Sequence, residues 1–339
     1  MPVIRVRILI ALFLFSCAAT SAAQTEPAPQ LSPQDRVRLA EVFRLGAELQ
    51  DKVWSKWSQA PFAVLLVTPA HEFLVRHPLP SEDFQSLGYD PHLRSNVHYR
   101  KRTFSTNLLA TFPAVGGIST IVVGPAETTQ AKTSTPWVIT LMHEHFHQWQ
   151  DSQPGFFQEA LALGLARGDQ SGMWMLNFPF PYEDPQINER YLAMTAALVA
   201  ALEARGTSQF DGRLRNYLEA RKKLQQALAP DDYKYLSFQL WKEGVARYTE
   251  YAVARLAAER FRPSAEFSSL SDFTPFAQEA EAALQRILRE LRTLTLAKDK
   301  RVCFYALGAG EALLLDEVNP AWKERYMKEK FDLERYFPK

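Results

Sequence analysis

Two histidines and a glutamate in the middle of the chain have the types and the spacing that metal-assisted hydrolysis requires. His143, Glu144 and His147 form an H-E-x-x-H match. Residues four apart share one face of a helix, so the two imidazoles can point nitrogens at one zinc ion. Glu144 can accept a proton from a water whose acidity the metal raises, and can later pass it to a leaving amine. His145 projects elsewhere on such a helix, and we expect it to be a polar or supporting residue rather than a ligand.

The residues before the motif predict the helix that this pair of histidines needs. A helix is expected over 136–150, with Thr135 as its N-cap. Pro136 suits the first helical position because the N–H that proline lacks would have no helical partner there. The local sequence therefore supports the motif.

A catalytic zinc site also needs a third protein ligand and an open position. In the metzincins a third histidine follows the first by ten positions, but here that position holds Gln153. A short spacing of the thermolysin type would place a glutamate near 166 or 167, which are Ala166 and Arg167. Neither spacing fits, so the third ligand must lie farther along the chain.

A second segment, E-G-V-A beginning at Glu243, lies in a predicted helix over 233–260. Here the chain resembles the gluzincins, the peptidase MA-like group of zinc metallopeptidases, in which an E-G-x-A segment presents a glutamate ligand from a second helix. The resemblance implies Glu243 as the third ligand of one zinc ion, with residues 151–235 as a helical insertion. Glu250, on nearly the same helix face, is the main competitor, and Glu159 is a weaker one.

A further resemblance lies at Tyr305, which begins a Y-x-x-G-A segment similar to that of the M1 family. The family implies that this tyrosine donates a hydrogen bond to the oxyanion of the tetrahedral intermediate. An aromatic packing residue is the equally weighted alternative, and Tyr248 is expected to be structural. The family also implies an edge strand that aligns the substrate backbone, for which 116–124 is the candidate. The G-x-M-E-N segment with which M1 enzymes bind the free amino terminus of a substrate is absent from this sequence, so the resemblance does not imply aminopeptidase activity.

Hydrophobic periodicity predicts an α+β fold. A helix over 33–57 is followed by strands at 62–68, 71–77, 97–104, 108–113 and 118–124. Helical patterns then dominate, over 136–150, 156–167, 186–205, 211–228, 233–260, 273–295, 301–316 and 320–335. We expect one zincin-like module over 31–339, with a small β-rich lobe at 31–135 and a helical lobe at 136–339.

The N-terminal residues predict export. Two arginines, an apolar run from Ile8 to Phe15 and small residues before Gln24 are typical of a secretory signal peptide over 1–23. A lipid anchor at Cys17 is the alternative, and residues 24–30 form a flexible lead-in. The apolar run is shorter than the roughly 20 residues a spanning helix needs. We therefore expect a periplasmic or secreted protein with no spanning segment after signal cleavage.

Neither the overall charge nor Cys303 indicates a further function. Lys and Arg number 39 against 38 Asp and Glu, so capture of nucleic acid is not indicated. Cys303 lies among apolar and aromatic neighbours and is expected to be a buried, inert thiol.

These features together predict a zinc-dependent peptidase that hydrolyses peptide bonds in a peptide or protein substrate. The alternative is a non-catalytic envelope protein that uses the same fold to bind peptides or to assemble. The aromatic segment 173–185 contains Trp174, Phe178 and Phe180, which could line a cleft or cover the protein's own core.

Overall fold

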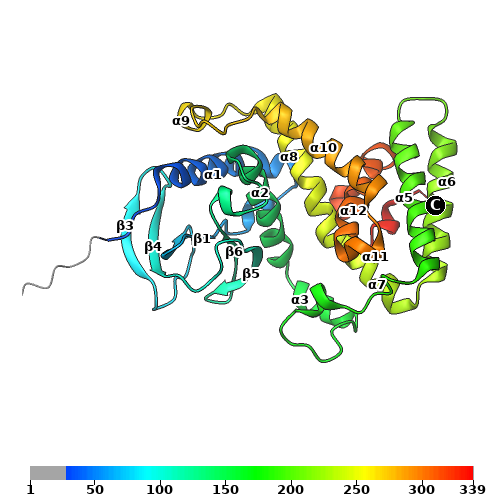
Figure 1. Ribbon diagram of the computed structural model, residues 1–339, viewed down its shortest axis with the longest axis horizontal. Coiled ribbons are helices and arrows are strands. Elements are labelled where there is room, and N and C mark those ends of the chain that lie inside the picture. Colours follow the sequence, from blue (N-terminus) through cyan, green and yellow to red (C-terminus); the bar gives the residue numbers. More distant parts are fainter. Residues whose placement is uncertain (1–27, 339) are drawn as a thin grey trace, which may run out of the picture. The chain divides into compact units, whose positions relative to one another are not determined.

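One helix comes first along the described chain, six strands follow it, and the rest is mainly helical. The computed structural model describes residues 28–338, so the predicted signal peptide, Cys17 and most of the lead-in lie outside the described residues. The predicted α+β class is confirmed (Figure 1). The strands are β1 (Val64–Val67), β2 (His71–Val75), β3 (Gln85–Asp90), β4 (Ser95–Lys101), β5 (Leu109–Val115) and β6 (Ile118–Val123). The helices are α1 (Pro33–Val53), α2 (Ser134–Asp151), α3 (Phe156–Ala162), α4 (Trp174–Asn177), α5 (Pro185–Glu203), α6 (Phe210–Ala227), α7 (Pro230–Gln239), α8 (Val245–Arg260), α9 (Ala265–Ser268), α10 (Phe276–Thr293), α11 (Leu296–Asp299), α12 (Cys303–Val318) and α13 (Trp322–Arg325).

Within residues 28–338 the six strands form one mixed sheet in the order β3-β4-β2-β1-β6-β5. The β1–β6 pair is parallel and the other pairs are antiparallel. Alternate side chains of β1 enter different apolar clusters, Val64 and Leu66 on one face and Leu65 and Val67 on the other. This is the period of two that a strand buried on both faces must show.

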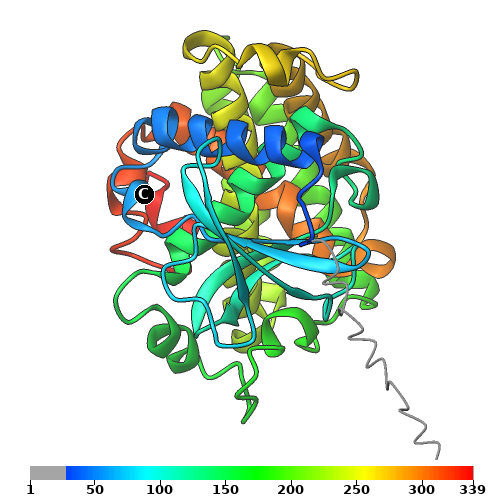
Figure 2. The same ribbon diagram turned by 90° about the vertical axis from the view of Figure 1, so that its left-hand side faces the viewer.

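Two helices cover the larger apolar face of the sheet. Leu39 and Leu45 of α1 and Met142 and Phe146 of α2 are buried in the same cluster as Val64 of β1. Figure 2 shows α1 crossing over the sheet. The helix that carries the H-E-x-x-H residues thus packs against both the sheet and α1.

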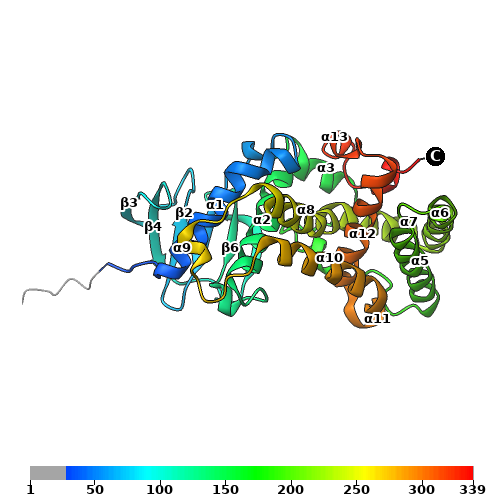
Figure 3. The same ribbon diagram turned by 90° about the horizontal axis from the view of Figure 1, so that it is seen from above.

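The predicted helix over 233–260 is interrupted where its glutamate lies. It consists of α7, a π-helical turn over Leu240–Gly244, and α8. A π turn contains one extra residue per hydrogen-bonded ring and is often found at functional sites. Figure 3 shows α8 side by side with α10, with α12 next to both.

Gly244 at the end of this turn and Gly308 of α12 allow the two helices to touch. A Cβ atom on Gly244 would lie 2.4 Å from Gly308 Cα, and one on Gly308 would lie 2.5 Å from the Leu240 carbonyl oxygen. Only glycine at both positions permits this approach without displacing backbone. The glycine of the E-G-V-A segment therefore has a packing role.

Two sequence expectations about elements are wrong, and one strand was not expected. The strand at 116–124 is not an edge strand, because β6 pairs with both β1 and β5, and the free edge on that side belongs to β5. Residues 320–335 do not form one helix: α13 ends at Arg325, and Phe331 has a φ of 70°, a left-handed conformation that no α-helix contains. The strand β3 was not predicted, because its side chains are mostly exposed and lack an apolar alternation.

Residues 31–339 form one compact unit. Among residues 28–338, none of the helices combines the length and the apolarity that crossing a membrane requires.

Candidate metal centre

Helix α2 presents His143, Glu144 and His147, all of them buried. The expected N-cap at Thr135 is wrong, because the helix begins at Ser134 and Thr133 makes no capping bond with its side chain. The cap comes instead from a distant carboxylate: Asp272 accepts hydrogen bonds from the Ser134 backbone N–H at 2.9 Å and from its hydroxyl at 2.7 Å. An anion at this end also suits the helix dipole.

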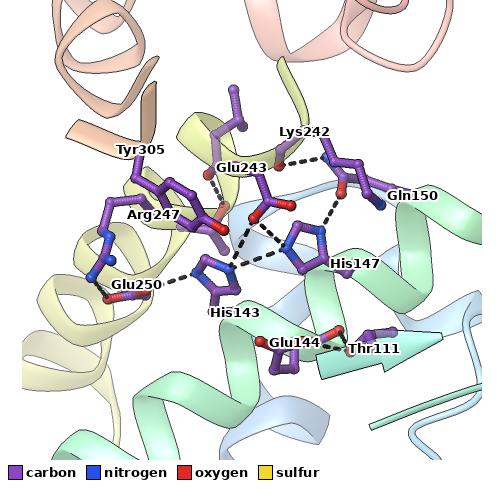
Figure 4. A network of polar contacts seen from close by, with 12 residues as sticks. Thr111, His143, Glu144, His147, Gln150, Lys242, Glu243, Arg247, Glu250 and Tyr305 are labelled. Carbon is purple, nitrogen blue, oxygen red and sulfur yellow. Dashed lines mark hydrogen bonds and ion pairs between the residues drawn. The ribbon is translucent and has the colours of Figure 1, made fainter. Parts of the chain in front are cut away.

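The π turn brings Glu243 to the two histidines, as Figure 4 shows. The Nε2 atoms of His143 and His147 lie 3.1 Å apart. Oε2 of Glu243 lies 3.3 Å from Nε2 of His147 and 4.0 Å from Nε2 of His143. A point equidistant from these three atoms is about 2.1 Å from each, within the range of roughly 2.0–2.2 Å for zinc bound to imidazole and carboxylate. These residues form a group that could hold a metal ion.

Hydrogen bonds at Nδ1 of the two imidazole rings determine which tautomer each ring adopts, and so whether its Nε2 atom can accept a metal ion. Nδ1 of His143 donates to Oε1 of Glu250 at 2.7 Å, and Nδ1 of His147 donates to Oε1 of Gln150 at 2.6 Å. A neutral imidazole that donates through Nδ1 carries a lone pair on Nε2. The two Nε2 lone pairs and the Glu243 carboxylate therefore converge as acceptors, an arrangement that a cation stabilises.

Gln150 also connects the two ligand-bearing segments. Its amide nitrogen donates to the carbonyl oxygens of Trp241 at 3.4 Å and Lys242 at 3.2 Å, and to the Tyr326 hydroxyl at 2.7 Å. These donor contacts fix the orientation of the amide and leave Oε1 as the acceptor for His147. Sequence reasoning missed Gln150, although its position three residues after His147 places it on the same helix face.

Glu250, the competing ligand candidate, lies behind His143 rather than beside the metal group. Its second oxygen is 2.6 Å from Nη2 of Arg286 and 3.4 Å from Nη1 of Arg247. Burial alone would raise the pKa of Glu250, but the two guanidinium groups and His143 hold that pKa well below its usual range. The carboxylate is therefore charged and orients the imidazole, as carboxylates behind metal-binding histidines do. The weaker candidate, Glu159, lies on α3 and pairs with Lys330 instead.

The one carboxylate of the metal group, Glu243, is also held in its charged form. Burial alone would raise the pKa of Glu243, but His147, Arg301 and Lys242 together hold that pKa well below its usual range. Burial acts against the charged form of His147 as well, yet the Glu243 carboxylate raises the pKa of His147. Both shifts come from the close approach of carboxylate and imidazole.

Glu144 points away from this pair toward the edge of the sheet. The Thr111 hydroxyl on β5 lies 2.7 Å from Oε2 of Glu144 and 3.1 Å from its carbonyl oxygen. One carboxylate oxygen is thus anchored to the edge strand. Nothing in the local sequence of Thr111 indicates this contact, because it depends on how the sheet packs against α2.

Tyr305 lies on the other side of the metal group, on α12. Its ring is nearly parallel to that of His143, with an angle of 10° and a centroid separation of 6.4 Å. Its hydroxyl oxygen accepts a hydrogen bond from Nη1 of Arg301 at 2.8 Å. Burial and the nearby Glu243 charge raise the pKa of Tyr305, so the phenol remains a donor.

His145, between the two histidines of the motif, is part of the core. Its ring stacks on Phe62 with centroids 3.8 Å apart, and Nδ1 contacts Gln148 at 2.9 Å. Burial lowers the pKa of His145 to about 3. The neutral ring therefore packs as an aromatic group.

The aromatic segment 173–185 covers the protein's core. Trp174, Phe178 and Phe180 are each at most 5% exposed. Of the two alternatives that the sequence left open, cover of the core is therefore the one that the structure supports. Cys303 is fully buried, and burial raises the pKa of its thiol to about 12.

Comparison with protein-family models, with curated proteins and with solved structures finds no match to this chain.

Proposed function

We propose that this protein is a zinc-dependent peptidase of the gluzincin type, with His143, His147 and Glu243 as metal ligands. The observation that carries the proposal is that two imidazole Nε2 atoms and one carboxylate oxygen lie close enough together to bind one zinc ion. Glu144 directly follows His143 in the same helix. Two histidines and a carboxylate are the donor set of catalytic zinc sites that keep one position open.

His143, His147 and Glu243 would hold the zinc ion, which when bound would supply Lewis-acid chemistry for peptide hydrolysis. Glu144 accepts the proton from the attacking water as the water oxygen bonds to the carbonyl carbon. Thr111 holds Oε2 of Glu144, so the proton is taken by a carboxylate of fixed orientation. The same proton then passes to the leaving nitrogen as the carbon–nitrogen bond breaks. Tyr305 donates a hydrogen bond to the carbonyl oxygen as negative charge develops on it.

The free edge of β5 is the place for an extended substrate. A peptide that adds to this edge forms backbone hydrogen bonds and makes few demands on its side chains. Because Thr111 of β5 contacts Glu144 directly, a substrate on that edge lies next to the general base. Export to the periplasm or the outside of the cell remains part of the proposal and rests on the N-terminal sequence.

Zinc content and proteolysis test the proposal together. Purified protein is dialysed, its zinc content is measured, and cleavage of casein is followed with and without a chelator. We expect about one zinc per chain, and a fall in turnover of at least about 100-fold for Glu144→Gln with zinc retained. Glu159→Gln is the matched control, because this exposed glutamate pairs with Lys330 on the surface and should leave both readouts unchanged.

The outcomes separate the alternatives. If the wild type and Glu144→Gln cleaved casein at equal rates, and a chelator did not change those rates, the enzyme proposal would be contradicted. Bound zinc without any cleavage would favour the non-catalytic peptide-binding role.

A further inference from the structure

Arg301 lies near the metal group and donates a hydrogen bond to the side chain of Tyr305. It lies in a 3-10 turn, Lys300–Val302, directly before α12, and its side chain is 23% exposed. Nη1 donates to the Tyr305 hydroxyl oxygen at 2.8 Å. The same guanidinium lies 3.8 Å from Oε1 of Glu243, the carboxylate oxygen that faces away from the histidines.

The chemistry of the two groups decides the direction of the phenol proton. A guanidinium is only a donor, so the Tyr305 oxygen must be the acceptor in this bond. The single O–H of the phenol is then free to donate elsewhere. The Glu243 carboxylate is a nearby hydrogen-bond partner for that O–H, and the ring lies nearly parallel to His143 beside the metal group.

A second arginine near the same ring shows that proximity alone does not produce this contact. The guanidinium carbon of Arg247 is 5.6 Å from the Tyr305 ring centroid, and that of Arg301 is 5.3 Å away. Arg247 directs Nη1 to Glu250, however, and only Arg301 bonds to the hydroxyl.

We propose that Arg301 is a positioning residue that orients the Tyr305 hydroxyl toward the oxyanion and strengthens it as a donor. This inference rests on the proposed peptidase function. A positive group bonded to the phenol oxygen makes its O–H a better donor to developing negative charge, in the way that charge strengthens other hydrogen bonds. Orientation of this kind acts in the transition state and not on substrate binding, so it should affect kcat and leave KM nearly unchanged.

Four variants test the inference kinetically: Tyr305→Phe, Arg301→Met, the double variant, and Arg301→Lys. Loss of the phenol should lower kcat about 100-fold, as removal of one oxyanion donor does in other hydrolases. Arg301→Met should lower kcat about tenfold with KM within about twofold, and the double variant should fall within about twofold of Tyr305→Phe. Arg301→Lys keeps a charged donor four residues before the tyrosine and should recover part of the loss. The control is Arg213→Met, which removes an exposed guanidinium from α6.

A spectroscopic readout tests the contact without turnover. Tyrosine labelled with 13C at Cζ reports hydrogen bonding at the phenol oxygen, and the Tyr305→Phe variant assigns the resonance. We expect this resonance to move in metal-free Arg301→Met and to stay in place in Arg213→Met.

Each result has a distinct meaning. An unmoved resonance, or losses that multiply in the double variant, would overturn the positioning role even if the wild type cleaves peptides. A wild type that binds zinc but never cleaves would overturn the proposed function, and with it the catalytic part of this inference, whereas the shifted resonance would still establish the Arg301–Tyr305 contact. Zinc content of every variant shows whether a loss comes instead through Glu243.

Discussion

The glycine contact between the π turn and α12 makes a quantitative prediction. In Gly308→Ala, the new Cβ would meet the Leu240 carbonyl oxygen at 2.5 Å and Gly244 Cα at 2.7 Å, where ordinary contact begins near 3.4 Å. Both obstacles are backbone atoms and cannot rotate aside. The helices must therefore separate by about 0.9 Å before the contact becomes ordinary.

The expected loss follows from two opposing effects. Overpacking a close-packed interior costs about 1–3 kcal/mol or somewhat more, and the upper end applies here because only helix displacement relieves it. Alanine in a helix is favoured over glycine by about 1 kcal/mol, which offsets part of that cost. We expect Gly308→Ala to lower the free energy of unfolding by about 2–3 kcal/mol. Zinc affinity should fall about tenfold as well, because Gly244 directly follows Glu243.

Urea unfolding of the metal-free protein measures the first effect, and competition with a chromophoric chelator measures the second. Gly212→Ala in α6 is the matched control: its nearest neighbouring atom would be 4.0 Å away, so it should stabilise the protein by about 0.5–1 kcal/mol. If Gly308→Ala were as stable as Gly212→Ala, the close approach of the helices would be refuted. A destabilised variant with unchanged zinc affinity would limit the glycine contact to packing.

Three further predictions concern single side chains. Gln150→Leu should weaken zinc binding about 10- to 100-fold in chelator competition, because it removes the acceptor behind His147; equal affinity would show that the ring is held by other contacts. Thr111→Val should lower kcat about tenfold by releasing Glu144, and Thr111→Ser should restore most of it, so a serine variant as slow as valine would contradict the hydrogen-bond role. Burial raises the pKa of Glu279 to about 7, so the wild type should lose stability as the pH rises from about 4.5 to 7. Glu279→Gln should therefore be neutral at pH 4.5 and stabilising by about 3 kcal/mol at pH 8 in urea unfolding; destabilisation at pH 8 would mean that Arg286 pairs with the charged carboxylate.

Local patterns predicted the elements and the motif residues well, because they depend on spacing within one helix. The H-E-x-x-H helix, the α+β order and the helix carrying Glu243 all follow from periodicity and short motifs. The π turn at Leu240–Gly244 breaks no sequence pattern, since apolar residues flank it on both sides. Its presence depends on α12 packing against it through Gly308, which is a contact between distant segments.

The groups that orient the site were harder to predict for the same reason. Thr111 and Arg301 act on residues that lie in other elements or in the next turn, and their roles depend on sheet order and helix crossing. The wrong edge strand at 116–124 shows this most directly. An alternating apolar pattern predicts a strand, but whether that strand has one neighbour or two is decided by pairing with β1 and β5.

The choice of an amide behind His147 can be explained by the backbone of the π turn. An acceptor is needed for the Nδ1–H of His147, and a carboxylate would satisfy it, as Glu250 does for His143. The other end of the same side chain, however, faces the carbonyl oxygens of Trp241 and Lys242, and a second carboxylate oxygen would repel both. Only a side chain with an acceptor and a donor fits between the ring and the turn. Gln150→Glu should therefore weaken the site despite strengthening the bond to the imidazole, which means that residue 150 is constrained by the turn carrying Glu243 as much as by the histidine it orients.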